Sequence, residues 1–239
     1  MKQRLFITLG MASLAMATFG VKKPKAAIKP LNAATVQQPS YTEWHDLQVN
    51  AINRFPLHTN FFTYSPEDMV YEEGGKLVSR DLAQVNKTMS KNYLSLEGTW
   101  KFNWVENADQ RPTDFYKVDL DDSNWKTMNL PGIWEMNGFG VPEYVNVGFG
   151  WRGHFDEQPP AVPTKDNHVG SYRRIIHIPE NWDGKQVVAH FGSVTSNIYL
   201  YVNGKFAGYA EDSKIAAEFD ITPYLKKGKN LIAFQTFRW

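Results

Sequence analysis

The segment NIYLYVNGKFAGYA, residues 197–210, constrains the fold more than any other part of the chain. Apolar and aromatic side chains alternate with small or polar ones on both sides of Asn203-Gly204. This residue pair best tolerates the two positive φ angles of a type I′ turn, which joins neighbouring antiparallel strands directly. The segment therefore predicts a tight β-hairpin with its turn at Asn203 and Gly204.

Other short runs between about residue 93 and residue 239 have the same character. They alternate with period two or form compact apolar stretches, and turn residues separate them. No window after residue 95 has helical periodicity of comparable quality. These runs predict an all-β domain, a β-sandwich, over residues 95–239, and the clearest of them are GTWKFNWV, SYRRIIHI, KQVVAHFG and NLIAFQTFRW.

A long connection from about residue 130 to residue 169 interrupts this rhythm. It is rich in glycine, proline and aromatic residues, and a loop of this size in a compact domain is usually functional or disordered. Its aromatic content argues against disorder. Its amide and aromatic side chains suit sugar hydroxyls and sugar faces, although each ring could instead pack the loop onto its own sandwich. The candidates are Asn137, Tyr144, Asn146, Phe149 and Trp151.

The first residues carry a targeting pattern. Lys2 and Arg4 precede the apolar run LFITLGMASLAMA, and Ala15-Met16-Ala17 fits the small-x-small cleavage rule. A membrane anchor is the alternative, but the apolar stretch is at the short limit for spanning a bilayer. We therefore expect a signal peptide at 1–17, a secreted or periplasmic protein and no membrane partner. A disordered linker at 18–40 and an extended, mostly loop-like arm at 41–94 are predicted to follow.

Composition excludes several classes of function. The 239 residues carry 26 basic and 25 acidic side chains, a formal net charge of +1 that gives no electrostatic footprint for nucleic acid. The absence of cysteine excludes disulfides, thiolate nucleophiles and cysteine-bound metals. The six histidines lack metal-ligand spacing, and no Gly-x-Ser-x-Gly elbow or phosphate loop is present. We expect no metal site and no catalytic residue in this chain.

A resemblance adds more than these patterns. Collinear segments covering about three quarters of the chain closely resemble the N-terminal, jelly-roll sugar-binding domain of family 2 glycoside hydrolases, specifically the large β-galactosidases. The segments are INRFPLHTNFF, SLEGTWKFNW, LPGIWEMNGFGVPEYVNV, VPTKDNHVGSYRR, HFGSVTSNIYLYVNGKFAGYAEDSKIAAEFDIT and GKNLIAFQTFRW. The resemblance implies that the chain is an N-terminal fragment of such an enzyme.

The same resemblance implies a function and one site residue. The parent enzyme hydrolyses terminal β-galactosides with retention, uses magnesium and sodium ions, acts as a homo-oligomer, and carries its two catalytic glutamates beyond residue 239. Asn146, within Tyr144-Val145-Asn146-Val147, matches an asparagine that contacts the galactose. Two alternatives stay open at this stage. Asn146 could be a turn-capping residue, and the chain could be a free-standing carbohydrate-binding module.

Overall fold

The fold is taken from a computed structural model that describes residues 37–62, 87–88, 90–143 and 160–239. The proposed signal peptide at 1–17 lies outside the described residues, as do most of the 18–40 linker and Asn146. Within the described ranges, no helix is long and apolar enough to cross a membrane. The domain boundaries drawn from the sequence therefore stay predictions.

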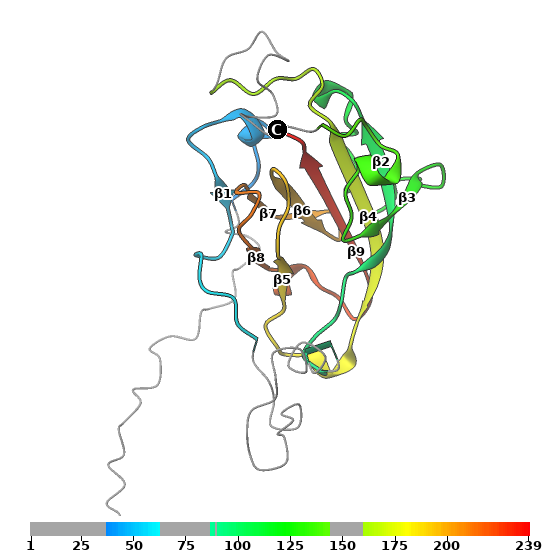
Figure 1. The fold of residues 1–239 in the computed structure, drawn as a ribbon. Helices are drawn as coiled ribbons and strands as arrows, with labels where there is room; N and C mark the ends of the chain where they lie inside the picture. Colours follow the sequence, from blue (N-terminus) through cyan, green and yellow to red (C-terminus); the bar gives the residue numbers. More distant parts are fainter. Residues whose placement is uncertain (1–36, 63–86, 89, 144–159) are drawn as a thin grey trace, which may run out of the picture.

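Nine β-strands and five 3-10 turns make up the named elements of the described part (Figure 1). The strands are β1 (Ala51–Ile52), β2 (Gly98–Val105), β3 (Lys126–Leu130), β4 (Val169–Ile178), β5 (Val188–Phe191), β6 (Ile198–Val202), β7 (Lys205–Ala210), β8 (Ala217–Asp220) and β9 (Gly228–Phe237). The turns are η2 (Glu43–His45), η4 (Ala108–Gln110), η5 (Glu135–Asn137), η6 (Glu180–Trp182) and η7 (Thr222–Tyr224).

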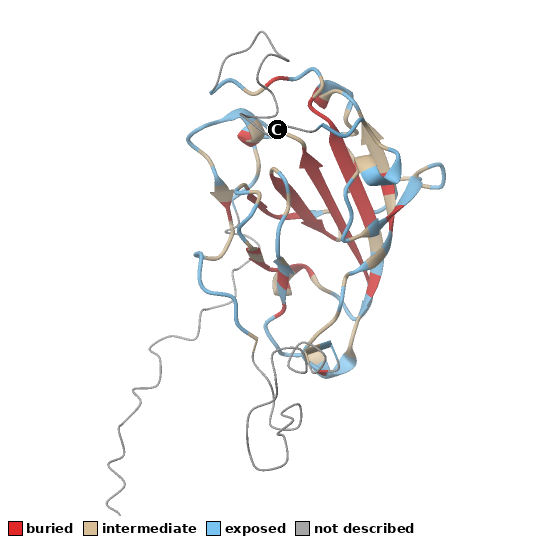
Figure 2. Ribbon diagram, in the orientation of Figure 1, coloured by how far each residue is buried: buried red, intermediate tan, exposed pale blue. Residues whose placement is uncertain are grey.

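Seven strands form one antiparallel sheet in the order β1-β7-β6-β9-β4-β2-β3, and β5 pairs with β8 in a second, two-stranded sheet. The long strands β4 and β9 lie at the centre, paired over ten residues from Val169↔Phe237 to Ile178↔Gly228. The buried positions in Figure 2 follow these central strands. The prediction of an all-β sandwich is confirmed.

The predicted hairpin is confirmed. Strands β6 and β7 pair antiparallel, with Val202 opposite Lys205, so Asn203 and Gly204 are the two turn residues. Their φ angles are +51° and +80°, the positive values that a type I′ turn needs at both positions. The Asn203 side chain also donates to the carbonyl of Tyr224 and accepts from the amide of Leu231. The turn is thereby fixed to the start of β9.

A first apolar core lies between the two sheets. Buried side chains of the large sheet, such as Phe102, Leu200 and Phe234, pack with Phe219 of β8 and with half-buried Phe191 of β5. Burial of side chains of this size is the main stabilising contribution to such a sandwich. The two-stranded sheet therefore covers this face of the seven-stranded sheet.

The opposite face of the large sheet is covered by chain segments without strands. Tyr199, Tyr201 and Phe237 point to this side and form a second core with Phe115 from the loop after β2. Arg173 of β4 is also buried here, where its guanidinium donates to a carboxylate oxygen of Asp122 at 2.8 Å and to backbone carbonyls. A buried charge needs this pairing, which fixes the loop onto the sheet.

The first part of the N-terminal arm is integrated with the sandwich. Glu43 is buried and accepts a hydrogen bond from the Tyr199 hydroxyl, and the Trp44 ring stacks on Phe237 at 5.0 Å. Strand β1 extends the large sheet by pairing with β7. Phe61, farther along, is 72% exposed. The arm is thus docked at its start, exposed at Phe61, and packed again at Leu94, which contacts the first core.

Strands β2, β5, β6 and β7 fall within runs that the sequence analysis identified, and β4 and β9 each begin two residues before their run. Strands β1, β3 and β8 were not predicted. These three have two, five and four residues. Pairing with a neighbouring strand defines them, namely β1 with β7, β3 with β2 and β8 with β5.

Candidate functional site at the base of the 144–159 segment

Asn146, the site residue taken from the resemblance, lies outside the described residues together with the rest of segment 144–159. Both flanks of the segment are described. Glu143 precedes it, and residues 160–168 lead from it into β4. These flanks meet at the end of the large sheet where β9 finishes, beside the label C in Figure 1.

Arg238 joins the two flanks. Its Nη2 lies 2.9 Å from Oε1 of Glu143, and its Nη1 lies 3.7 Å from Oδ1 of Asp166. The Arg238 side chain is 12% exposed and that of Glu143 24%, so this pair is shielded from bulk water more than a surface pair would be, whereas Asp166 is 40% exposed. One guanidinium at the end of β9 therefore links the residue before the segment to a residue after it.

His168 completes the charged group. Its Nε2 lies 2.8 Å from Oδ1 of Asp166, and its Nδ1 lies 3.4 Å from Nη1 of Arg238. A guanidinium can only donate, so Nδ1 accepts and Nε2 carries the hydrogen donated to Asp166. His168 thus contacts both Asp166 and Arg238 and helps to hold Asp166 in place.

Backbone anchors hold the same flank. Asn167 is fully buried; its Oδ1 accepts from the amide of Trp239, and its Nδ2 donates to the carbonyl of Pro163. The amide of Arg238 donates to the carbonyl of His168 at 2.9 Å. Directional bonds on both sides of Asp166 leave the second flank little freedom to shift.

The first flank rests on aromatic side chains. Phe139 packs edge-on against buried Phe102 with centroids 4.7 Å apart, and Trp104 packs against His168 at 4.9 Å. A Cβ at Gly140, whose φ is +81°, would lie 3.1 Å from the His168 ring. Glycine therefore permits both the turn and the close approach to His168.

Trp134 connects this packing to the first core. Its indole Nε1 donates to the hydroxyl of Tyr172, a residue of β4 in the first core. Burial of Tyr172 raises the pKa of its hydroxyl, while the hydrogen bond from Trp134 opposes this rise only in part. The phenol stays neutral and serves as a fixed acceptor for the flank.

This arrangement joins the two described flanks of segment 144–159 through one side chain at the end of β9. Glu143 and Asp166 both pair with the one guanidinium of Arg238. Within the described ranges no group of three or more His, Cys, Asp or Glu side chains could hold a metal ion. The described residues therefore offer no cluster of such side chains for the magnesium and sodium implied for the parent.

The sequence analysis missed this cluster. Glu143, Asp166 and Arg238 are separated by up to 95 residues, and only the pairing of β4 with β9 brings the last two together. The one local signal was the unusual ending of an apolar strand in Phe-Arg-Trp. Asn137, a predicted sugar-contacting candidate, donates from Nδ2 to the carbonyl of Ile133 within its own turn, and its contact with a sugar stays a prediction.

Comparison with known proteins identifies the family to which this chain belongs. Residues 93–239 match the family described as "Glycosyl hydrolases family 2, sugar binding domain". A β-galactosidase of Halalkalibacterium halodurans is 36% identical over 200 residues, which cover 83% of this chain and 18% of that protein. A β-galactosidase of Priestia megaterium is 34% identical over 206 residues, covering 86% of this chain and 19% of that protein.

Among solved structures, a β-glycosidase from Bacteroides vulgatus is similar with a TM-score of 0.44 and 26% identity, covering 59% of this chain and 16% of that one. The chain spans about a fifth of the length of the two curated relatives named above. The family match extends over more than half of the residues, from Tyr93 to the end of the described sheet. This chain belongs to glycosyl hydrolase family 2, through its sugar-binding domain.

Proposed function

We propose that this chain is the N-terminal, jelly-roll sugar-binding part of a retaining β-galactosidase that hydrolyses terminal β-D-galactosides in carbohydrate catabolism. The names of its relatives, each matched over about a fifth of its length, support this proposal. The parent enzyme is proposed to be a secreted or periplasmic homo-oligomer, exported by the signal peptide at 1–17.

The chain by itself is proposed to be inactive. Retaining hydrolysis needs two carboxyl groups about 5 to 5.5 Å apart on either side of one glycosidic bond. The resemblance assigns both glutamates, and the magnesium and sodium sites, to parts of the parent that follow this domain. What this chain contributes is an amide, Asn146, which can both donate to and accept from a galactose hydroxyl.

The main structural support for this proposal is that Arg238 pairs with both flanks of segment 144–159, through Glu143 and Asp166. A contact with a sugar hydroxyl contributes to catalysis only if it is held at the right place when the transition state forms. The guanidinium is therefore proposed to set the position from which Asn146 reaches the galactose.

The test compares two asparagines of the same connection in the parent enzyme. Asn146→Ala removes the proposed sugar contact, and Asn137→Ala removes the hydrogen bond to Ile133 inside a turn. Losing one hydrogen bond to a neutral hydroxyl is worth about 0.5–1.5 kcal/mol, so kcat/KM should fall roughly three- to twelvefold for Asn146→Ala with the melting temperature unchanged. Asn137→Ala should lower the melting temperature and leave kcat/KM of the folded enzyme intact.

A melting-temperature loss without an activity loss in Asn146→Ala would show a turn-capping residue and remove the proposed sugar contact. The alternative of a free-standing carbohydrate-binding module is tested separately by reading the gene beyond codon 239. An in-frame continuation into further domains supports the parent enzyme, whereas a stop codon at that position in independent genomes supports the module.

A further inference from the structure

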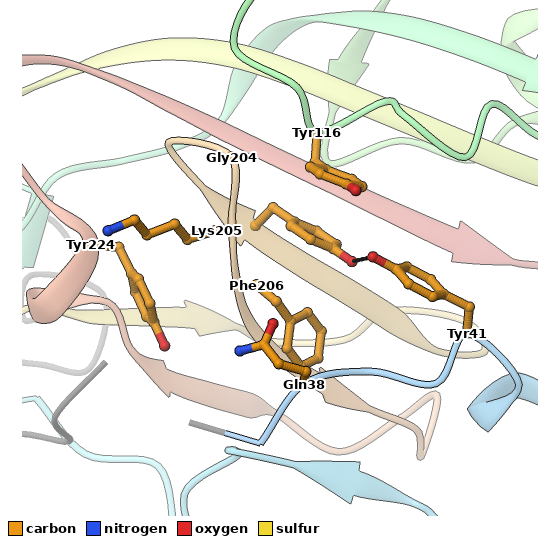
Figure 3. A pocket seen from close by; sticks show the side chains of 8 residues that line it. Gln38, Tyr41, Tyr116, Gly204, Lys205, Phe206 and Tyr224 are labelled. Carbon is orange, nitrogen blue, oxygen red and sulfur yellow. Dashed lines mark hydrogen bonds between the residues drawn. The ribbon is translucent and has the colours of Figure 1, made fainter. Parts of the chain in front are cut away.

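A hollow of about 480 Å³ opens beside the turn of the β6–β7 hairpin (Figure 3). Its walls come from four separate parts of the chain, which are the segment before η2, the loop after η4, the hairpin and η7. Its volume falls within the range of small-molecule sites, about 300–1,000 Å³. The aromatic residues that line it are Tyr41, Tyr116, Tyr201, Phe206 and Tyr224.

The rings are fixed by contacts with one another. Tyr116 stacks on Tyr201 with centroids 4.2 Å apart and an interplanar angle of 8°, and Phe206 meets Tyr201 edge-on at 5.3 Å. The Tyr201 hydroxyl donates to the Tyr41 hydroxyl at 2.9 Å, the dashed line in Figure 3. A ligand would enter a site whose rings are already ordered, and this reduces the entropy lost on binding.

The lining also selects a ligand class. Gln38 contributes an amide, the tyrosines contribute phenolic hydroxyls, and Lys205 is the single charged residue among the lining residues. A multiply charged ligand would find one partner there, and a purely apolar ligand would cover polar groups without pairing them. Tyr201, Phe206 and Tyr224 are more than nine-tenths buried, whereas Tyr41 and Tyr116 keep exposed ring surface. A neutral pyranose has an apolar C–H face for these two rings and hydroxyls for the amide and the phenols.

We infer that this groove is a second, non-catalytic binding site for a neutral sugar unit. It lies away from the charged cluster. Val202, next to the hairpin turn, pairs with Ile232 in the first half of β9, whereas Arg238 follows the last residue of β9. Six residues of extended strand separate Ile232 from Arg238, roughly 20 Å. The site is independent of the galactose contact proposed for Asn146.

The experiment titrates the isotope-labelled 239-residue chain with lactose and follows amide chemical shifts by NMR. We expect saturable shifts confined to Tyr41, Tyr116, the hairpin at 201–206 and Tyr224, with a dissociation constant on the order of 1 mM. The binding readout requires no catalysis. A failure here therefore leaves the proposed β-galactosidase function untouched, and a failure of that function leaves this site untouched.

Variants test the assignment. Tyr116→Ala removes a stacking ring and should weaken lactose binding about fivefold, while Phe61→Ala, which removes an exposed aromatic ring outside the groove, should change nothing. Tyr224→Phe removes only a hydroxyl and should weaken binding about threefold. This milder variant decides the question if Tyr116→Ala fails to fold.

Three results would each overturn the inference. One is the absence of lactose shifts in the groove at saturating concentration, and another is equal lactose binding by the wild-type chain, Tyr116→Ala and Tyr224→Phe. The third is binding of glucuronate or of the apolar dye anilinonaphthalene sulfonate in the groove with no binding of lactose, which would make it an anion site or an apolar docking surface.

Discussion

The β6–β7 hairpin and the base of segment 144–159 are organised on different principles. In the hairpin, neighbours in sequence are neighbours in space. The Asn203-Gly204 turn sets the register as far as Tyr201 opposite Phe206, and a bulge shifts it by one residue beyond that pair. At the base of segment 144–159, residues 143, 166 and 238 meet only because the sheet has already formed. The hairpin is stabilised by local pairing, whereas the contacts at the base of segment 144–159 depend on the sheet that brings distant residues together.

The largest expected effect is on the free energy of unfolding and comes from a buried residue of the β6–β7 hairpin. Leu200 of β6 has no exposed surface, so Leu200→Ala should remove buried methyl groups, leave a cavity and lower the free energy of unfolding by about 2–5 kcal/mol. Urea unfolding of the chain measures it. Leu47→Ala, at a position 66% exposed, is the matched control and should stay within about 0.5 kcal/mol of the wild type.

The turn itself gives the next effect. Gly204 and Gly138 have nearly equal φ angles, +80° and +82°. Their surroundings differ. A Cβ added at Gly204 would lie 3.4 Å from Val118, whereas a Cβ added at Gly138 would have none of the described residues within 4 Å. Valine at either position is strained by roughly 1–3 kcal/mol. Gly204→Val should cost more than Gly138→Val in melting experiments, since it also crowds Val118. Equal losses would mean that the backbone angle alone sets the cost.

A smaller effect tests the loop base. Glu143→Gln removes the charge that faces Arg238, whose side chain is 12% exposed, and should destabilise the chain by about 1 kcal/mol. Asp183→Asn removes one partner of the Lys227 pair, in which both side chains are at least 75% exposed, and should cost nothing measurable. Denaturation of both variants at low and high salt provides the comparison. Equal losses for the two pairs would show that the Arg238 cluster is no better than a surface contact.

The smallest effect concerns the arm that docks beside the hairpin. Both ring nitrogens of His58 face oxygens at 2.8 Å, those of Thr59 and Glu218, and Nδ1 of His190 faces the other Glu218 oxygen at 2.8 Å. The Thr59 carbonyl and then Glu218 raise the pKa of His58. Burial alone would raise the pKa of Glu218, but hydrogen bonds from His190 and His58 outweigh burial and lower it.

The pH dependence follows from these directions. The His58 contribution is complete below its ordinary pKa of 6.5 and is lost as the pH rises through its raised value. The Glu218 contribution is retained above its ordinary value of 4.5. Hydrogen exchange of the Phe55 amide, which donates to the Glu218 carbonyl, should therefore be slowest near pH 5–6.5 after correction for intrinsic rates. Protection that does not change up to pH 9, or that persists in Glu218→Gln, would contradict this contribution.

The hairpin and the long strands could be predicted because their signals are local. Residues 198–210 carry alternation and turn chemistry within one short window, and β9 contains the apolar run Leu231–Phe234 after a turn. The interior position of Arg173 could not be predicted from the same alternation, because it depends on Asp122 and on carbonyls of a loop that folds over that face.

The candidate site was predictable only in part. The length and aromatic content of the 130–169 connection indicated a functional loop, and the resemblance supplied Asn146 as an expectation. The Arg238 cluster left no such trace, because its ion pairs form between distant residues after β4 and β9 pair. Short strands such as β1 were missed for the same reason, since pairing with β7 defines β1 more than its own two residues do.

The most direct test of the positioning role is a double-mutant cycle in the parent enzyme between Arg238 and Asn146. If Arg238 acts by placing Asn146, Arg238→Gln should lower kcat/KM about fivefold when Asn146 is present and have almost no further effect on Asn146→Ala. Melting temperatures of all four proteins verify that the folded enzyme is being compared. Independent losses, with the double variant's kcat/KM reduced by the product of the two single effects, would contradict the account.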